Sequence, residues 1–259
     1  MKIGVCVPCY KRLKFTKFCV PMYIQNAGIE AHWYLVDDCS QDGTAEFLLN
    51  LALTNDRVYV IENNENMGIA PTRNKVFKRM LDDGMDIFVN VDNDLLLPMN
   101  WLRDLVTVLQ DSMFSVIAPW FCNDDNINRQ LKKKRPLDKF LPFEAIRARV
   151  GSTCILYKRE IFERGIFYPD KKANWTYQDS QHHKIITHCG FEIALYTGVQ
   201  AWRLEHIVWD DMEEEKLRVR HDILNKGDMS GFEKNLEHRK RSIPFGSIAD
   251  TESSSDDQV

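Results

Sequence analysis

Apolar runs and amphipathic segments alternate along the first hundred residues. Four runs have the length of buried strands, and the segments between them repeat apolar residues at helical intervals. The expected strands are 3–7, 32–36, 57–61 and 86–91, and the expected helices are 15–26, 44–53 and 71–80. Gly28 and Gly84 follow two of these helices, as glycine often does, and Pro71 suits a first helical turn. Because parallel strands need crossover helices, this alternation predicts an α/β fold with a mostly parallel sheet and helices on both faces.

The pattern is more mixed beyond residue 100. Further helices are expected at 101–110 and 179–188, and further strands at 115–118, 150–157, 192–196 and 201–206. Residues 123–141 are polar and charged, and we interpret them as a loop that orders over a bound ligand. We expect a main domain of residues 1–211, in two halves of 1–98 and 99–211. A helical extension, 212–245, and a disordered acidic tail, 246–259, are expected after it.

Composition and charge narrow the class of protein. With 259 residues and 44% hydrophobic content, the chain can bury one sizeable core. A net charge of −4 does not indicate a nucleic-acid-binding surface, and the basic run 132–135 is interpreted as a solvated loop. The sequence enters a strand at once rather than a secretory signal, and it contains no apolar run long enough for a transmembrane segment. Seven scattered cysteines suit reduced thiols, so we expect a cytoplasmic protein.

Carboxylates follow two of the expected strands. Asp37 and Asp38 come after the strand 32–36, and Asp92 and Asp94 come after the strand 86–91. The carboxyl ends of parallel strands share one edge of a sheet, where ligands bind in folds of this kind. A buried, unpaired charge is costly, so these acids should meet a cation or a polar ligand.

The spacing of Asp92 and Asp94 favours a metal ion. In extended backbone, residues two apart point to the same side, so both carboxylates could face one crevice. Mg²⁺ and Mn²⁺ prefer such hard oxygen ligands and complete their shells with phosphate oxygens and water. The alternative is that the two acids cap the following turn or helix.

Two further residues suit a nucleotide. The carboxylate of Asp38 can accept a hydrogen bond from a nucleobase or a ribose, whereas turn and capping chemistry accounts for Asp42 and Thr44. Arg73 lies in the first turns of a helix, from which its guanidinium could reach a diphosphate. The alternative for Arg73 is a solvated side chain or a pair with an acid such as Glu65.

Four motifs together resemble glycosyltransferase family 2 with the GT-A fold. They are Val7-Pro8-Cys9-Tyr10, the segment 36–44 (VDDCSQDGT), Asn66-Met67-Gly68 with Arg73-Asn74, and Val91-Asp92-Asn93-Asp94. The resemblance is close over about the first hundred residues and looser to about His206. It implies a GT-A sheet flanked by helices on both faces, with the half 1–98 binding nucleotide and the half 99–211 binding acceptor.

The resemblance also implies roles for individual residues. The nucleotide-binding residues would be Pro8, Tyr10, Asp38, Arg73 and Asp92. Asp94 and His206 would bind Mn²⁺ or Mg²⁺, and Asp179 would be the catalytic base, although Gln178 stands where the family usually has a glutamate. Ser152 and Trp175 are expected to line the acceptor site. Leu204 replaces the tryptophan of the signature found in processive members, so the enzyme should be non-processive.

The function that the resemblance implies is transfer of a single sugar from a nucleoside-diphosphate sugar. The donor is expected to be UDP-linked, the acceptor to be a hydroxyl of a glycan or another molecule, and the reaction to invert the anomeric centre. A catalytically silent glycan- or nucleotide-binding module remains an alternative, because Gln178 departs from the usual acid pair. A sugar-1-phosphate nucleotidyltransferase is a second alternative, although Pro8–Arg12 lacks the glycines of its phosphate loop. No feature of the sequence indicates an oligomeric state.

Overall fold

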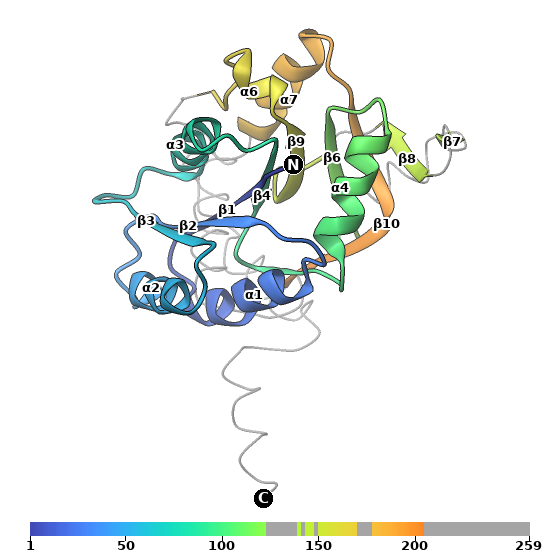
Figure 1. The fold of residues 1–259 in the computed structure, drawn as a ribbon. Coiled ribbons are helices and arrows are strands. Elements are labelled where there is room, and N and C mark those ends of the chain that lie inside the picture. Colours follow the sequence, from blue (N-terminus) through green and yellow to red (C-terminus); the bar gives the residue numbers. More distant parts are fainter. Residues whose placement is uncertain (123–138, 141–142, 148–149, 170–177, 205–259) are drawn as a thin grey trace, which may run out of the picture. The chain divides into compact units, whose positions relative to one another are not determined.

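A single mixed sheet forms the centre of the chain (Figure 1). The computed structural model describes residues 1–122, 139–140, 143–147, 150–169 and 178–204. Its strands are β1 (Ile3–Cys9), β2 (His32–Asp37), β3 (Val58–Glu62), β4 (Ile87–Val91), β5 (Leu95–Leu96), β6 (Val116–Phe121), β7 (Lys139–Phe140), β8 (Phe143–Arg147), β9 (Cys154–Lys158) and β10 (Ile193–Arg203). They are ordered β3-β2-β1-β4-β9-β6-β10-β8-β7, and β5 pairs with β10.

Parallel pairing covers the first half of the sheet, as the sequence predicts. Strands β3, β2, β1 and β4 run parallel to one another. Strand β9 is antiparallel to both of its neighbours, β4 and β6, while β6 and β10 are again parallel. All residues of β1 and β4 are buried, which accounts for their continuous apolar runs. The predicted α/β class and the mixed, mostly parallel sheet are confirmed.

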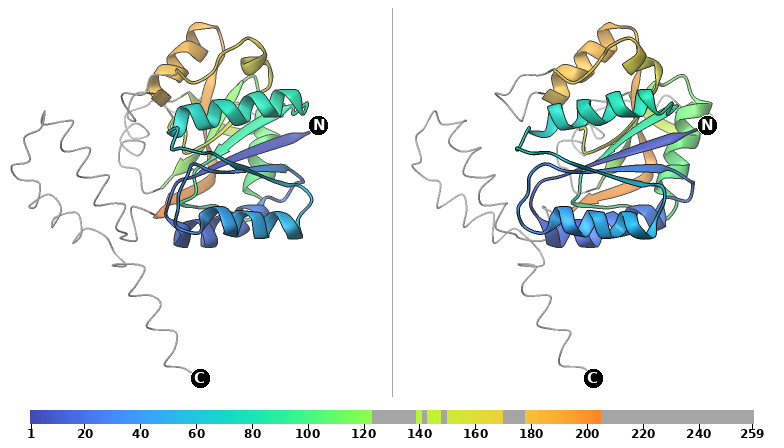
Figure 2. Two further views of the ribbon diagram at one scale, coloured as in Figure 1. Left: turned by 90° about the vertical axis from the view of Figure 1, so that its left-hand side faces the viewer. Right: turned by 60° about the vertical axis from the view of Figure 1, so that its left-hand side comes forward.

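Helices cover both faces of the sheet. They are α1 (Leu13–Asn26), α2 (Thr44–Thr54), α3 (Ile69–Asp82), α4 (Trp101–Asp111), α6 (Glu160–Glu163) and α7 (Gln178–His188). Figure 2 shows α1 and α2 along one face and α3 and α7 along the other. The described helices lack the combination of length and hydropathy that a membrane span requires.

Three predicted elements differ from the structure. The strand expected at 150–157 is β9, which begins only at Cys154. The strands expected at 192–196 and 201–206 are one strand, β10, whose pairing with β6 shifts register between Tyr196 and Gln200. This irregularity interrupts the apolar alternation, so the sequence gives the appearance of two strands. Residues 139–140, expected within a loop, form the short strand β7.

Several predictions concern residues outside the described part of the chain. A first compact unit spans Met1–Trp202, and a second spans Arg203–Val259, of which only Arg203 and Leu204 are described. The boundary after residue 211, the extension 212–245, the tail 246–259 and most of the expected loop 123–141 therefore stay predictions. The same holds for Trp175 and His206.

Candidate active site

The carboxyl ends of β1 and β2 carry unusual backbone conformations. Lys11 and Arg12 follow β1 with φ angles of 55° and 60°, and Cys39 and Gln41 follow β2 with φ angles of 63° and 58°. A residue with a Cβ adopts this left-handed region at a cost of about 1–2 kcal/mol. Such strain clusters where a fold holds side chains for function. Because β1 and β2 are parallel, both strained loops lie at the same edge of the sheet.

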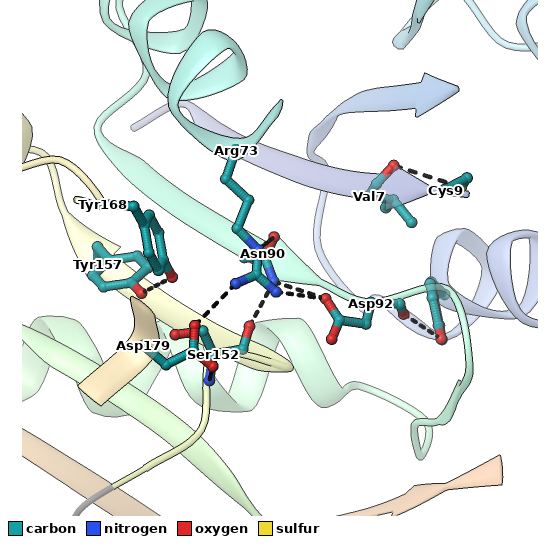
Figure 3. A network of polar contacts seen from close by, with 10 residues as sticks. Val7, Cys9, Arg73, Asn90, Asp92, Ser152, Tyr157, Tyr168 and Asp179 are labelled. Atoms are coloured by element: carbon teal, nitrogen blue, oxygen red, sulfur yellow. Dashed lines mark hydrogen bonds and ion pairs between the residues drawn. The ribbon is translucent and has the colours of Figure 1, made fainter. Parts of the chain in front are cut away.

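A buried arginine joins three elements next to this edge (Figure 3). Arg73, on α3, is only 4% exposed at its side chain. Its Nε donates to Asn90 Oδ1 on β4 at 3.0 Å, Nη2 donates to Asp92 Oδ1 at 2.8 Å, and Nη1 donates to Asp179 Oδ1 on α7 at 3.2 Å. Arg73 thus has acid partners, but they are Asp92 and Asp179 rather than Glu65. The expected contact of Arg73 with a diphosphate stays a prediction.

Opposing effects act on the ionisation of this cluster. Burial raises the pKa of Asp92 above its ordinary value, Arg73 opposes that rise, and the nearby Asp179 adds to it. Burial acts to lower the pKa of Arg73, but the surrounding acids, Asp92 foremost, raise it overall, so the guanidinium stays charged. The site therefore holds two carboxylates around one permanent cation.

Asn90 was not identified from the sequence, although a signal was present. It is a fully buried amide inside the apolar run of β4, where a polar side chain needs partners. Its Nδ2 donates to the carbonyl of Ser152 at 2.6 Å, and its Oδ1 accepts from Arg73. Asn90 thus ties β4 to the segment before β9.

Ser152 lies next to Asp179. Its side chain is fully buried in the structure. Its backbone N–H donates to Asp179 Oδ2 at 3.2 Å. Ser152 therefore supports Asp179 through the main chain, and its expected contact with an acceptor stays a prediction.

An aromatic layer lies beneath Arg73 and Asp179. The hydroxyls of Tyr157 and Tyr168 are 2.7 Å apart, and the ring centroid of Tyr168 lies 4.0 Å from that of His182. The guanidinium carbon of Arg73 lies 5.3 Å from the Tyr168 ring centroid, in cation–π geometry. The layer supplies a stiff support for the arginine and for α7.

Acidification is expected to destabilise the fold through His182. Burial lowers the pKa of this histidine from 6.5 to about 3. The unfolded chain therefore binds more protons than the folded chain between these values, so stability present above pH 6.5 is lost as the pH falls. At pH 5 the expected loss is about 2 kcal/mol, and His182→Asn should remove most of it in urea unfolding at pH 7 and pH 5.

The matched control is His188, an exposed histidine on the same helix. His188→Gln should retain the wild-type loss of stability between the two pH values. An unchanged loss in His182→Asn would contradict the assignment to His182.

The two acids of the Asp-x-Asp motif do not point to one side. Asp92 pairs with Arg73 on α3, whereas Asp94 Oδ2 accepts from Arg12 Nη1, next to α1, at 2.6 Å. Helices α1 and α3 cover opposite faces of the sheet (Figure 2). The expectation of a shared direction is wrong because residues 92–94 form a turn between β4 and β5 instead of extended backbone.

Contacts with α1 hold this turn in place. Asn93 Nδ2 donates to Thr16 Oγ1 at 2.8 Å. The hydroxyl of Tyr23 donates to the carbonyl of Asp92 at 2.9 Å and accepts from the Leu95 N–H at 2.8 Å. The position of this turn therefore depends on the position of α1.

The protein ligands available near Asp92 and Asp94 suit a cation that is bound mainly by phosphate oxygens and water. Asp92 and Asp94 offer hard carboxylate oxygens, but one oxygen of each already faces an arginine. The described residues contain no group of three or more His, Cys, Asp or Glu side chains placed to hold a metal, and the expected ligand His206 lies outside them. Asp94, as a single carboxylate ligand, fits a Mg²⁺ or Mn²⁺ ion whose other ligands are phosphate oxygens and water.

Asp38 holds the loop that leads into α3. Its carboxylate accepts from Asn63 Nδ2 at 2.7 Å and from the N–H groups of Met67 and Gly68 at 3.0 Å each. A carboxylate offers about four acceptor positions, so the predicted contact with a base or ribose remains compatible with these bonds. Asp37 accepts from the Ser40 N–H through Oδ2, while its buried Oδ1 has no hydrogen-bond partner in the described part of the chain.

The remaining predicted nucleotide residues lie at the end of β1. Pro8 is buried in the strand beside Val36, and Tyr10 follows the strand, half-buried. Both thus stand at the same sheet edge as Asp38, and their contacts with a nucleotide stay predictions.

Comparison with known proteins agrees with this geometry. The model of the family "Glycosyl transferase family 2" matches residues 4–166. The putative teichuronic acid biosynthesis glycosyltransferase TuaG of Bacillus subtilis (strain 168) is 32% identical over 79 residues, which is 30% of this chain and 31% of that protein. The chain thus matches about a third of the length of that curated relative.

Solved structures share the fold at low identity. The mannosyltransferase PcManGT from Pyrobaculum calidifontis, in complex with GDP-Man and Mn²⁺, has a TM-score of 0.65 at 18% identity, covering 100% of this chain and 76% of that one. S. aureus TarS 1–349, in complex with UDP-GlcNAc, has a TM-score of 0.57 at 17% identity, covering 85% and 65%. The expected GT-A fold is confirmed by this likeness.

Proposed function

The chain belongs to glycosyl transferase family 2, and we propose that it transfers a sugar from a nucleoside-diphosphate sugar to an acceptor hydroxyl. One observation carries the proposal most directly. Arg73 brings the strand-end acid Asp92 together with Asp179, which lies 106 residues beyond Arg73 in the chain. The acid expected beside the donor and the acid expected to act as base therefore share one guanidinium.

The reaction would be a displacement at the anomeric carbon of the donor. Asp179 would accept the proton of the attacking acceptor hydroxyl, and Arg73 with the Ser152 N–H would hold its carboxylate in place. A bound divalent cation would neutralise charge on the departing diphosphate, with Asp94 and His206 as its expected ligands. Attack opposite the leaving group gives inversion, and the chain would transfer one sugar per encounter.

A uridine nucleotide is the donor that we favour. Pro8, Tyr10 and Asp38 would surround the base and ribose at the end of β1 and β2. The similar structures in complex with UDP-GlcNAc and with GDP-Man support nucleoside-diphosphate sugars as the donor class. The acceptor is a glycan or another molecule with a free hydroxyl.

Release of nucleotide from a panel of sugar nucleotides tests the proposed function. With Mn²⁺ present, the wild type should release nucleotide from at least one UDP-, GDP- or dTDP-linked sugar. Asp94→Asn keeps the shape of the side chain but removes its charge, and it should slow release by at least about tenfold. The matched control is Asp104→Asn, which alters an exposed acid paired with Arg103 at 3.0 Å.

The panel also separates the alternatives. Binding of a nucleotide without release from any donor would favour a silent binding module. Formation of a sugar nucleotide from a nucleoside triphosphate and a sugar-1-phosphate would indicate a nucleotidyltransferase. Equal release by the wild type and Asp94→Asn would contradict the role given to Asp94.

A further inference from the structure

Asp94 forms a buried ion pair with Arg12. Arg12 Nη1 lies 2.6 Å from Asp94 Oδ2, and the two side chains are 3% and 10% exposed. Buried pairs of this kind are worth little net stability compared with apolar residues, so their presence often reflects a need other than stability. The pair blocks one oxygen of the acid that the proposed function gives to a metal.

The backbone holds Arg12 in this position. Lys11 and Arg12 are two successive left-handed residues, and Arg12 then caps α1. The guanidinium carbon of Arg12 lies 5.3 Å from the ring centroid of Phe15, one turn into α1. Arg12 is thus placed by β1 and α1 and does not reach Asp94 as a flexible surface side chain.

The charges of the site oppose a cation that arrives alone. As a pair, the Arg12 guanidinium and the Asp94 carboxylate carry no net charge. A divalent cation that arrives alone would make this pair positively charged overall and would have to displace Arg12 from Asp94 Oδ2. A diphosphate that arrives with the cation offsets its charge and offers a second anion to the displaced guanidinium.

We propose that Arg12 is a positioning residue that occupies Asp94 as an internal counter-ion and keeps a divalent cation from binding there until the diphosphate of the donor arrives. This inference rests on the proposed function, because that function supplies the diphosphate. It concerns the order of binding and not the chemical step. The metal and the donor would then bind together, and the affinity for metal would be low when no donor is bound.

Titration of the full chain with Mn²⁺ tests the inference, with free Mn²⁺ followed by its electron paramagnetic resonance signal. Without nucleotide, Arg12→Gln should bind Mn²⁺ at least about tenfold more tightly than the wild type, because Asp94 loses its competing cation. UDP should raise the Mn²⁺ affinity of the wild type by a similar factor and that of Arg12→Gln by less. The double variant with Asp94→Asn should lose the gain, which identifies Asp94 as the ligand.

Arg57→Gln is the matched control. It removes an arginine from an exposed ion pair, with Arg57 Nη1 at 2.7 Å from Glu30 Oε1, and it should leave the Mn²⁺ affinity unchanged. Should Arg12→Gln fail to fold, Arg12→Lys retains a cation without the planar fork and should bind Mn²⁺ more tightly than the wild type by a smaller factor.

Two results would overturn the inference. One is an equal Mn²⁺ affinity in the wild type and in the folded Arg12 variant without nucleotide. The other is a wild-type Mn²⁺ affinity that UDP does not change. If either result holds and the wild type still turns over a sugar nucleotide, the inference fails and the proposed function stands. If the wild type turns over no sugar nucleotide, a higher Mn²⁺ affinity in Arg12→Gln still establishes that Arg12 and Mn²⁺ compete for Asp94.

Discussion

Arg73→Met is expected to lower the free energy of unfolding by about 3–5 kcal/mol, because it leaves two acids without their shared buried cation. Arg73 is 4% exposed at its side chain and donates to Asn90, Asp92 and Asp179. Methionine fills similar space but provides no donor. Urea unfolding at neutral pH, followed by circular dichroism, measures the change.

The control for Arg73 comes from the same helix. Arg79 is 63% exposed at its side chain and pairs with Asp83 one turn along α3. Exposed pairs of this kind contribute little, so Arg79→Met should change stability far less than Arg73→Met. Comparable losses in the two variants would show that the buried network does not stabilise the fold. Arg73→Lys should lie between the two, because an ammonium keeps the charge but cannot bridge three acceptors in one plane.

Asp179→Asn is expected to reduce kcat for sugar transfer by about 10²- to 10⁴-fold, the usual contribution of a general base. An amide keeps the shape of the side chain and can still accept from Arg73 Nη1, but it cannot take a proton from an acceptor hydroxyl. The affinity for UDP should change little, because the base acts on the acceptor. Steady-state kinetics with the donor found in the panel, together with calorimetric titration of UDP, measures both quantities.

Asp104 provides the control that distinguishes the loss of one negative charge from the loss of the catalytic base. Asp104→Asn removes a carboxylate that is 41% exposed at its side chain on α4 and should leave kcat unchanged. A kcat of Asp179→Asn within a few-fold of the wild type would contradict the role of Asp179. A parallel fall in UDP affinity would instead indicate that Asp179 acts through Arg73 and Asp92 on donor binding.

The order of strands and helices could be predicted because it depends on local patterns. The apolar runs of β1, β2, β3 and β4 are short, bounded and separated by amphipathic segments, so each element is identifiable from its own residues. Parallel pairing then follows from the crossover helices. The shift of register within β10 could not be predicted, because it depends on the pairing of that strand with β6.

The partners of the charged side chains could be predicted only in part. Asp92 and Asp94 stood out because they follow a buried strand. Arg12, the partner of Asp94, did not stand out, because it lies in the basic stretch KRLK and has the composition of a solvated loop. Its burial depends on two left-handed residues and on an acid 82 positions away, neither of which leaves a local signal. Asn90 was also missed, although it does leave a local signal, since an amide inside an apolar strand indicates a buried polar network.

The place of β9 in the sheet has a consequence for how the chain folds during synthesis. Strand β4 ends at Val91, but the strand that covers its free edge, β9, is Cys154–Lys158. All residues of β1 to β4 are synthesised well before those of β9. A nascent chain that ends before about residue 150 therefore exposes the backbone N–H and C=O groups at the edge of β4, which is apolar and buried in the complete fold. Such an edge readily pairs with another chain. We therefore expect truncated forms that end before β9 to aggregate.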